Sequence, residues 1–285
     1  MSIQSRIEAS AAGFTPVMRR IAEVIRQNPA LVRDKPISEF AVLCRTSVAS
    51  IVRFCQSLGL SGYPELRMTI ATELGRETAQ FGTTLTLGAE LAQSDSLKEM
   101  AAKVATLEMM AIEETVSAID FKALGRIVSA LDRAQRILLF GIGASQFVAQ
   151  DLHHKLFRIG RNAFLMADTH EAWTAALLSP PRTVALGFSH SGVTADTIRY
   201  LEIARENGAH TVAITGVPES PLARIAHDAL IAHARESTLR AGAMVSRIAQ
   251  LALVDCLFLG LARTSYDDTI DALRRTRDVT HPGLA

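Results

Sequence analysis

Apolar side chains recur every three or four positions over residues 1–75, which is typical of amphipathic helices rather than of strands. Thr15 and Ser47 are of the residue types that cap helix N-termini, and Gly59 is of the type that most often closes a helix. Pro29 ends the first helix, because the residue before a proline disfavours the helical conformation. Four helices are therefore expected: from Thr15 to Asn28, over Ile37–Leu43, from Ser47 to Gly59, and from residues 61–64 through Leu74.

The pattern changes twice further along the chain. Residues 76–95 are small, polar and weakly periodic, so we expect them to form a linker. Helical spacing returns from Leu97 to about Ile119 and again from Phe121 to Leu131. From Arg136 onward, short β-rich runs alternate with helical stretches. The expected strands are 137–141, 163–166, 183–188, 211–215 and 229–233, and the expected helices are 145–158, 169–178, 194–207, 219–226 and 241–263.

This alternation predicts a doubly wound α/β fold, in which a mostly parallel sheet carries helices on both faces. A chain of 285 residues has the length of two ordinary domains. We therefore expect an all-α domain at 1–77 and an α/β domain with C-terminal helices at 121–285. A linker and a connecting helix at 78–120 would join them.

Charge is distributed unevenly between these two parts. The whole chain has a net charge of +1, but residues 1–80 contain 10 Lys and Arg against 7 Asp and Glu, which gives +3 there and leaves −2 for the rest. A mildly basic first module is compatible with nucleic-acid binding. Aromatic residues make up only 5% of the chain, which disfavours a surface built from stacked rings.

The cysteines and the apolar segments indicate an intracellular protein. Cys44, Cys55 and Cys256 form no CxxC pair, so no zinc site or disulfide framework is expected, and reduced thiols in a cytoplasm are the simplest account. No apolar core of a secretion signal is present near the N-terminus. The most apolar stretch, 241–262, is interrupted by charged and polar residues, so we expect a buried helix and no membrane span.

The helices expected over Ile37–Leu43 and from Ser47 have the spacing of a helix-turn-helix. Such a motif places the N-terminal residues of its second helix in the major groove of DNA. The candidate DNA-binding residues are Arg45 in the turn and Ser47, Ser50 and Arg53 on the second helix, because Arg and Ser donate hydrogen bonds to phosphates and base edges. A small helical bundle without a nucleic-acid role is the alternative.

Two loops that follow expected strands carry glycine and hydroxyl side chains. The first contains Gly141, Gly143 and Ser145, and the second is Ser189-His190-Ser191-Gly192-Val193-Thr194. Hydroxyl groups and free amides at a helix N-terminus bind anions, and loops at the carboxyl ends of parallel strands bind ligands. We therefore expect a phosphate site formed by Ser145, Ser189, Ser191 and Thr194. Simple helix capping is the alternative, above all for Thr194.

The N-terminal motif resembles the helix-turn-helix of bacterial transcription regulators of the RpiR/MurR type. The resemblance rests on VRF at 52–54, LG at 58–59 and SGY-PEL at 61–66. That family commonly has Gly in the turn where this chain has Arg45. A turn residue with positive φ suits Gly, and a larger side chain there carries a modest strain.

The two loops resemble those of the sugar isomerase (SIS) domain, a phosphosugar-binding fold. GxGxS at 141–145 and SxSGxT at 189–194 match that pattern, although Val193 stands where the family often has an acidic residue. The resemblance implies that the hydroxyls of both loops hold the phosphate of a phosphorylated sugar. It also extends to segments 234–236 and 240–262. The candidate ligand-binding residues are then Gly143, Ser145, Ser189, His190, Ser191, Thr194, Glu236 and Arg240.

SIS folds occur in enzymes and in regulators, so the fold alone does not decide between them. An aldose–ketose isomerase needs a base and a ring-opening acid. Glu236 and His190 are candidate bases, but no complete acid–base set is found, so no catalytic residue, metal or cofactor is assigned.

We expect a cytoplasmic homodimer or homotetramer that binds a palindromic double-stranded DNA operator and regulates carbohydrate metabolism genes. A phosphorylated sugar would modulate its DNA affinity. A phosphosugar isomerase with an accessory helical domain is one alternative, and an interaction protein with a vestigial ligand pocket is another.

Overall fold

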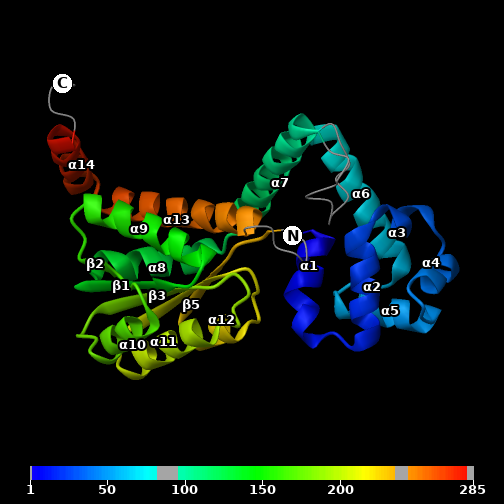
Figure 1. Cartoon of the computed structure of the whole chain (residues 1–285), viewed down its shortest axis with the longest axis horizontal. Coiled ribbons are helices and arrows are strands. Elements are labelled where there is room, and N and C mark those ends of the chain that lie inside the picture. The colour runs from blue at the N-terminus through cyan, green and yellow to red at the C-terminus, as the bar shows by residue number, and fades with distance from the viewer. Residues whose placement is uncertain (1, 82–95, 235–242, 281–285) are drawn as a thin grey trace. The chain divides into compact units, whose positions relative to one another are not determined.

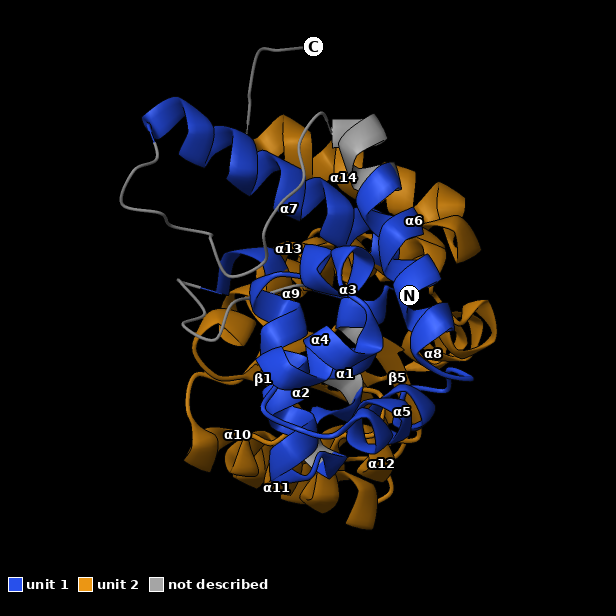
Figure 2. Ribbon diagram, turned by 90° about the vertical axis from the view of Figure 1, so that its right-hand side faces the viewer, with its two compact units in different colours: residues 1–114, 233–245 blue, residues 115–232, 246–285 orange. Residues whose placement is uncertain are grey.

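The computed structural model describes residues 2–81, 96–234 and 243–280, and these divide into two units (Figure 2). The helical unit contains residues 1–114 and 233–245. The sheet unit contains residues 115–232 and 246–285. The boundaries expected from the sequence pattern, at residues 77 and 121, differ from this division between residues 114 and 115, which is based on contacts within each unit.

The helical unit contains the expected helices and three further short ones, α1, η1 and α3, among the described residues. The predicted Ile37–Leu43 helix is confirmed, and both predicted caps are present: Thr15 accepts a hydrogen bond from the Met18 amide and Ser47 accepts one from the Ser50 amide. The elements are α1 (Ile3–Ser10), η1 (Ala11–Gly13), α2 (Pro16–Gln27), α3 (Ala30–Asp34), α4 (Ile37–Leu43), α5 (Val48–Ser57), α6 (Tyr63–Phe81) and most of α7 (Leu97–Ser117) (Figure 1).

The predicted linker over 76–95 is wrong for residues 76–81, which continue α6 as far as Phe81. Arg, Glu, Ala and Gln in this segment are good helix formers, which favours continuation of the helix. The remainder of that predicted linker, 82–95, lies outside the described residues.

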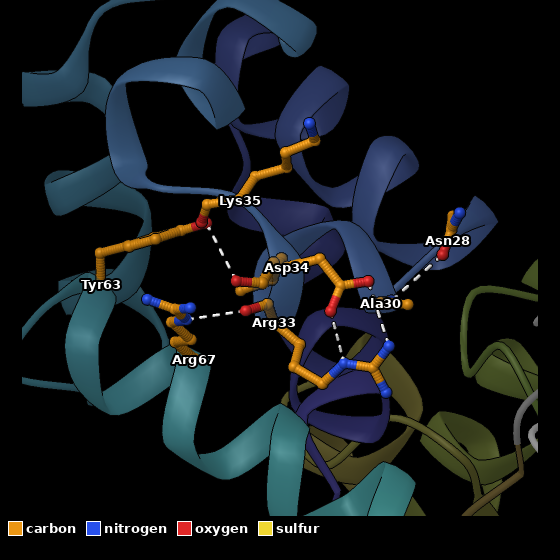
Figure 3. A network of polar contacts seen from close by, with 8 residues as sticks. Asn28, Ala30, Arg33, Asp34, Lys35, Tyr63 and Arg67 are labelled. Atoms are coloured by element: carbon orange, nitrogen blue, oxygen red, sulfur yellow. Dashed lines mark hydrogen bonds and ion pairs between the residues drawn. The ribbon is translucent and has the colours of Figure 1, made fainter.

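Side chains of α6 form hydrogen bonds with the C-terminal end of α3, just before the helix-turn-helix begins. The Tyr63 hydroxyl lies 2.9 Å from the carbonyl oxygen of Lys35 and 3.2 Å from that of Val32, and Arg67 Nε donates to the carbonyl of Arg33 over 2.8 Å (Figure 3). Burial raises the pKa of Tyr63 to about 12, so its hydroxyl remains a neutral donor. These contacts satisfy carbonyls that a helix leaves unpaired at its C-terminus.

The sheet unit alternates strands and helices as predicted. Each predicted strand is present, and each predicted helix is present within a few residues at its ends; α14 lies in the region where further C-terminal helices were expected. The elements are α8 (Phe121–Arg133), β1 (Arg136–Gly141), α9 (Ala144–Arg158), β2 (Ala163–Leu165), α10 (Thr169–Leu177), β3 (Thr183–Phe188), α11 (Ala195–Glu206), β4 (His210–Thr215), α12 (Pro221–Ile225), β5 (Asp228–Ile231), α13 (Met244–Thr264) and α14 (Tyr266–Thr280).

The five strands form one parallel sheet in the order β2-β1-β3-β4-β5. Leu138, Phe140 and Ala185 share a core with α10, α11 and α12 on one face, whereas α8, α9 and α13 cover the other (Figure 1). Because both faces are covered, the central strands β1 and β3 are apolar at every position after their first residues, Arg136 and Thr183. This confirms the predicted doubly wound, parallel α/β fold.

α13 is long and apolar enough to cross a membrane by length and composition alone. In the sheet unit it packs as a core helix, since Ala249, Leu253, Leu257 and Leu261 are buried. This agrees with the buried helix expected over 241–263.

We predict that Tyr63→Phe destabilises the protein by about 1–2 kcal/mol, because it leaves the Lys35 and Val32 carbonyls without their donor. Urea unfolding of the full chain measures this change. Ser129→Ala is the control, because it removes an exposed hydroxyl of α8. Equal midpoints for both variants would contradict a structural role for the Tyr63 hydroxyl.

Candidate nucleic-acid interface and candidate phosphate site

The turn between α4 and α5 has the hydrogen bonds of a Schellman motif. The Thr46 amide donates to the Ala41 carbonyl and the Arg45 amide to the Val42 carbonyl, both over 2.9 Å. This motif needs a left-handed residue immediately after the helix, and Arg45 fills that place with φ of +49°. The strain expected for a large side chain in this turn is therefore present. Gly59 closes α5 in the same way, with φ of +76°.

The proposed DNA-contacting side chains lie at and after the N-terminus of α5. Arg45, Ser47 and Arg53 are exposed and Ser50 is half-buried. The hydroxyls of Ser47 and Ser50 lie 3.1 Å apart, and Arg53 Nη2 donates to Ser50 Oγ over 3.3 Å. Ser47 also caps α5, so its oxygen accepts a backbone hydrogen bond in addition to any contact with DNA.

The arginines around α5 have no acidic partners. Arg20 extends from α2 to the turn, where its Nη2 lies 3.5 Å from the Arg45 carbonyl oxygen. Among the residues that the structure describes, Arg20, Arg45 and Arg53 form no ion pair. Three other cations of the helical unit are paired: Arg26 with Glu23, Arg33 with Asp34, and Lys35 with Glu39. Exposed, unpaired guanidinium groups next to a helix N-terminus form a surface suited to phosphates.

We predict that Arg45→Gly and Arg45→Ala both weaken DNA binding but change stability in opposite directions. Glycine relieves the left-handed strain and should stabilise the fold by about 0.5–1 kcal/mol, whereas alanine keeps the strain and should not. Thermal unfolding and fluorescence anisotropy with labelled DNA measure the two effects. Equal unfolding midpoints for the glycine and alanine variants would show that the positive φ costs nothing.

The second candidate site lies where the order of the sheet reverses. β1 is the strand from which the chain crosses to β2 on one side and then to β3 on the other. Gly141 at the end of β1 is in register with Phe188 at the end of β3, so the loops that follow these strands are neighbours. Open parallel sheets bind ligands in the crevice outside the carboxyl ends of the strands at such a point.

The first loop presents the N-terminus of α9. Gly143 occupies the N-cap position with φ of +61° and ψ of −128°, a conformation that L side chains rarely adopt. Ser145 follows in the first turn and is half-buried. A Cβ at Gly141 would lie 3.0 Å from the Phe188 Cβ and from the Ser145 carbonyl group, so this glycine lets the start of α9 pack against the strand ends.

The second loop gathers three of its hydroxyls around the start of α11. Thr194 stands at the N-cap, but its side chain does not cap the helix; its Oγ1 lies 2.9 Å from Ser189 Oγ instead. Ser189 is buried and accepts a hydrogen bond from the Gly192 amide, so it holds the loop in shape. Ser191 and Thr194 are half-buried. The capping alternative for Thr194 is therefore wrong for its side chain.

The loop after β4 supports this second loop, and its residues were missed in the sequence. Thr215 Oγ1 donates to the His190 carbonyl over 3.2 Å, and the Leu222 amide donates to the Gly192 carbonyl over 3.1 Å. A Cβ at Gly192 would lie 2.1 Å from Ser220 Oγ. The available signal was weak: Thr215 ends a strand, and Ser220 precedes a proline as an N-cap does.

His190 and Val193 face different surroundings. The His190 ring lies against Gly216, where an added Cβ would come within 2.3 Å of Cε1, and the residue is half-buried. Val193 is 60% exposed. Glu236 and Arg240, the remaining candidates, lie outside the described residues. Within the described ranges, no three His, Cys, Asp or Glu side chains form a group that would hold a metal ion.

We predict that Gly192→Ala destabilises the sheet unit by at least 2 kcal/mol more than Gly208→Ala does, because buried overpacking adds to strain. Both glycines have positive φ, but a Cβ at Gly208 meets no atom within 4 Å. Gly208→Ala therefore reports the strain alone, of about 1 kcal/mol. Similar unfolding midpoints for the two variants would contradict the close contact with Ser220.

The helix-turn-helix and the parallel sheet define a DNA-binding regulator with a ligand-binding domain, and comparisons with known proteins place it more narrowly. Residues 1–77 match the "Helix-turn-helix domain, rpiR family" and residues 130–260 match the SIS domain. An HTH-type transcriptional regulator from Caldanaerobacter subterraneus subsp. tengcongensis is 35% identical over 96% of this chain and 95% of that protein. The chain belongs to the rpiR family of HTH-type transcriptional regulators, which confirms the family expected from the motifs.

Two solved structures are similar to this chain. One is the Vibrio vulnificus NanR protein complexed with ManNAc-6P, which is 29% identical with a TM-score of 0.62 and covers 99% of both chains. The other is the sugar isomerase domain of an RpiR transcription factor from Sphaerobacter thermophilus, which is 27% identical with a TM-score of 0.57. It matches 62% of this chain and 97% of that one.

Proposed function

We propose that this regulator binds a palindromic operator as a cytoplasmic homodimer, and that a phosphorylated sugar bound by the sheet unit changes its DNA affinity without being turned over. The observation that carries the proposal is the convergence of two hydroxyl-bearing loops and two helix N-termini at the β1/β3 switch point. The donors there suit a phosphate group.

Ser145, Ser191 and Thr194 are the proposed phosphate contacts. Ser189 is proposed to hold the loop in shape, because its buried hydroxyl accepts a hydrogen bond from the Gly192 amide and shares one with the Thr194 hydroxyl. Gly143 stands at the N-cap of α9 without a capping side chain, so no side chain of this residue occupies the amides at the start of that helix. His190 lies beside the site. The similar NanR structure contains ManNAc-6P, a phosphorylated amino sugar, which supports a ligand of this class.

Glu236 and Arg240 are proposed to contact the sugar portion of the ligand, as the resemblance of their segments implies. No step of the proposal needs them as an acid or a base. The similar full-length relative is named as a transcriptional regulator, which supports a sensor rather than an isomerase.

The proposed DNA contacts are Arg45, Ser47, Ser50 and Arg53, with Arg20 as a further phosphate contact. The absence of ion-pair partners for the three arginines, among the residues described, supports this surface. Two copies would read two half-sites about 34 Å apart, as helix-turn-helix dimers do.

For the ligand, we predict that a phosphosugar panel including ManNAc-6P contains a compound that stabilises the full chain. Ligand at about 100 times Kd adds about 2.7 kcal/mol, which raises Tm by roughly 5–10 °C for a chain of this size. Ser191→Ala with Thr194→Ala should abolish the shift and leave DNA binding intact. Ser129→Ala with Thr174→Ala, two exposed hydroxyls elsewhere in the sheet unit, is the matched control. A full shift in the loop variant would place the ligand elsewhere.

For the DNA, we predict that Arg53→Ala weakens binding to an operator upstream of the chain's own gene or of a neighbouring sugar-catabolic operon. A lost base contact of this kind costs about 1–3 kcal/mol, or roughly 5- to 150-fold in Kd. Arg26→Ala is the control, because that arginine is paired with Glu23. Gel retardation and anisotropy measure the change, and equal losses in the two variants would contradict the assigned face.

A further inference from the structure

A groove in the sheet unit lies far from the proposed phosphate site. α9, α13 and α14 enclose a volume of about 470 Å³ with an apolar floor of Phe258, Ile270 and Leu273, and Arg158 and Arg274 stand at its edge. α14 follows α13 and contacts α9 beside it (Figure 1). Arg158 ends α9, whereas the phosphate site is at the other end of that helix, about 20 Å away at 1.5 Å per residue. The groove is therefore a separate feature.

α14 is covered by the rest of the unit only in part. Thr269 is its only buried residue among those whose side chains are described. Ile270 and Leu273 are half-buried, and Tyr266 is 63% exposed. These three apolar side chains are spaced by four and then three residues, so they share one face of the helix. The groove and this face leave a continuous apolar surface open to a partner.

The charges of α14 are divided between its two halves. The first half contains Asp267, Asp268 and Asp271, and the second contains arginines at 274, 275 and 277 against the single acidic residue Asp278. Such a division also complements the dipole of a single helix. It has a further consequence, because a second helix of the same sequence placed antiparallel presents its acidic half to the basic half of the first.

The charges that such a pairing needs lie on exposed side chains. Among the described residues, Asp267, Asp268 and Arg274 have no ion-pair partner, whereas Arg277 is paired with Asp278 over 3.2 Å and these two side chains are 59% and 63% exposed. Asp271 and Arg275 lie 3.6 Å apart within the helix, and both side chains are more than two-thirds exposed. An exposed ion pair within one helix contributes little to stability, so its two side chains can instead pair with those of a partner helix at little cost.

We propose that α14 pairs antiparallel with α14 of a second copy of this chain, so that the apolar faces of both helices close over the two grooves. A two-fold axis at Ala272 brings Asp267 of each copy opposite Arg277 of the other and places Asp268 opposite Thr276, next to Arg275. The same surface is used twice, as in any isologous dimer. This inference rests on the proposed homodimer and names its interface.

Two helices of this length bury less surface than a stable dimer needs, which is about 1,200 Å² or more in total. The walls of the groove supply the remainder. Lys155 of α9, which is paired with Asp151 and Asp255, and Phe258 of α13 therefore belong to the same interface.

Charge exchange in the full chain tests the pairing. One variant makes α14 basic (Asp267→Arg with Asp268→Arg) and another makes it acidic (Arg275→Glu with Arg277→Glu). Sedimentation equilibrium should show each variant dimerising at least tenfold more weakly than the unchanged chain. An equimolar mixture of the two should form heterodimers, and the chain with all four substitutions should dimerise again. Arg133→Glu with Arg182→Glu, two exposed positions elsewhere in the unit, is the control.

Recovery in the mixture and in the fourfold variant separates loss of pairing from loss of folding. A monomeric unchanged chain would overturn the proposed homodimer itself. A dimeric chain that neither pair of substitutions weakens would overturn the α14 interface and leave the homodimer standing. The interface is also wrong if the dimer persists and Arg158→Ala with Arg274→Ala abolishes stabilisation by inorganic phosphate, because the groove would then hold a small anion.

Discussion

The candidate ligand site depends on the parallel pairing of β1 with β3. That pairing sets Gly141 beside Phe188, so the two loops that follow these strands start from one place on the sheet edge. The crossovers from β1 and β3 leave in opposite directions, because β2 and β4 lie on opposite sides of this pair. Two helix N-termini, those of α9 and α11, therefore lie at this edge of the sheet.

The helix-turn-helix shows strain and unpaired charge at the surface assigned to DNA. Arg45 has a left-handed conformation in a turn whose hydrogen bonds call for glycine, and it has no acidic partner among the described residues. The left-handed conformation costs stability in the absence of DNA, and the unpaired side chain places a cation at the start of the recognition helix. Local strain of this kind is commonly concentrated at functional sites. Behind the motif, Tyr63 and Arg67 fix α3 to α6, so the surface is supported by a rigid element.

Much of the fold could be predicted because local signals agreed with tertiary structure. Thr15, Ser47 and Gly59 mark helix ends through hydrogen bonds made within a few residues, and the apolar strands reflect a sheet buried on both faces. The short helices α1 and α3 were not identified individually, because brief helices depend on tertiary packing more than on propensity. Residues 76–81 were assigned to a linker since their composition is polar, yet they extend α6.

The sequence was sufficient to predict which loops form the candidate phosphate site, but not how the residues of these loops contact one another. Glycines and hydroxyls after strands are visible in the sequence, whereas the support from Thr215 and Ser220 arises only when β4 lies next to β3. The different roles of Ser189 and Ser191 also required the structure, because one hydroxyl is buried within the loop and the other is only half-buried.

The central claim is that one phosphorylated sugar and one operator act on the same equilibrium of the full chain. The direct test is a closed cycle: operator affinity is measured with and without the stabilising phosphosugar, and phosphosugar affinity is measured with and without operator, at one salt concentration. The account predicts that both affinities change by the same factor, on the order of 5- to 150-fold, because coupling between two sites is reciprocal. The account would be contradicted if the phosphosugar did not change the operator affinity and the operator did not change the phosphosugar affinity.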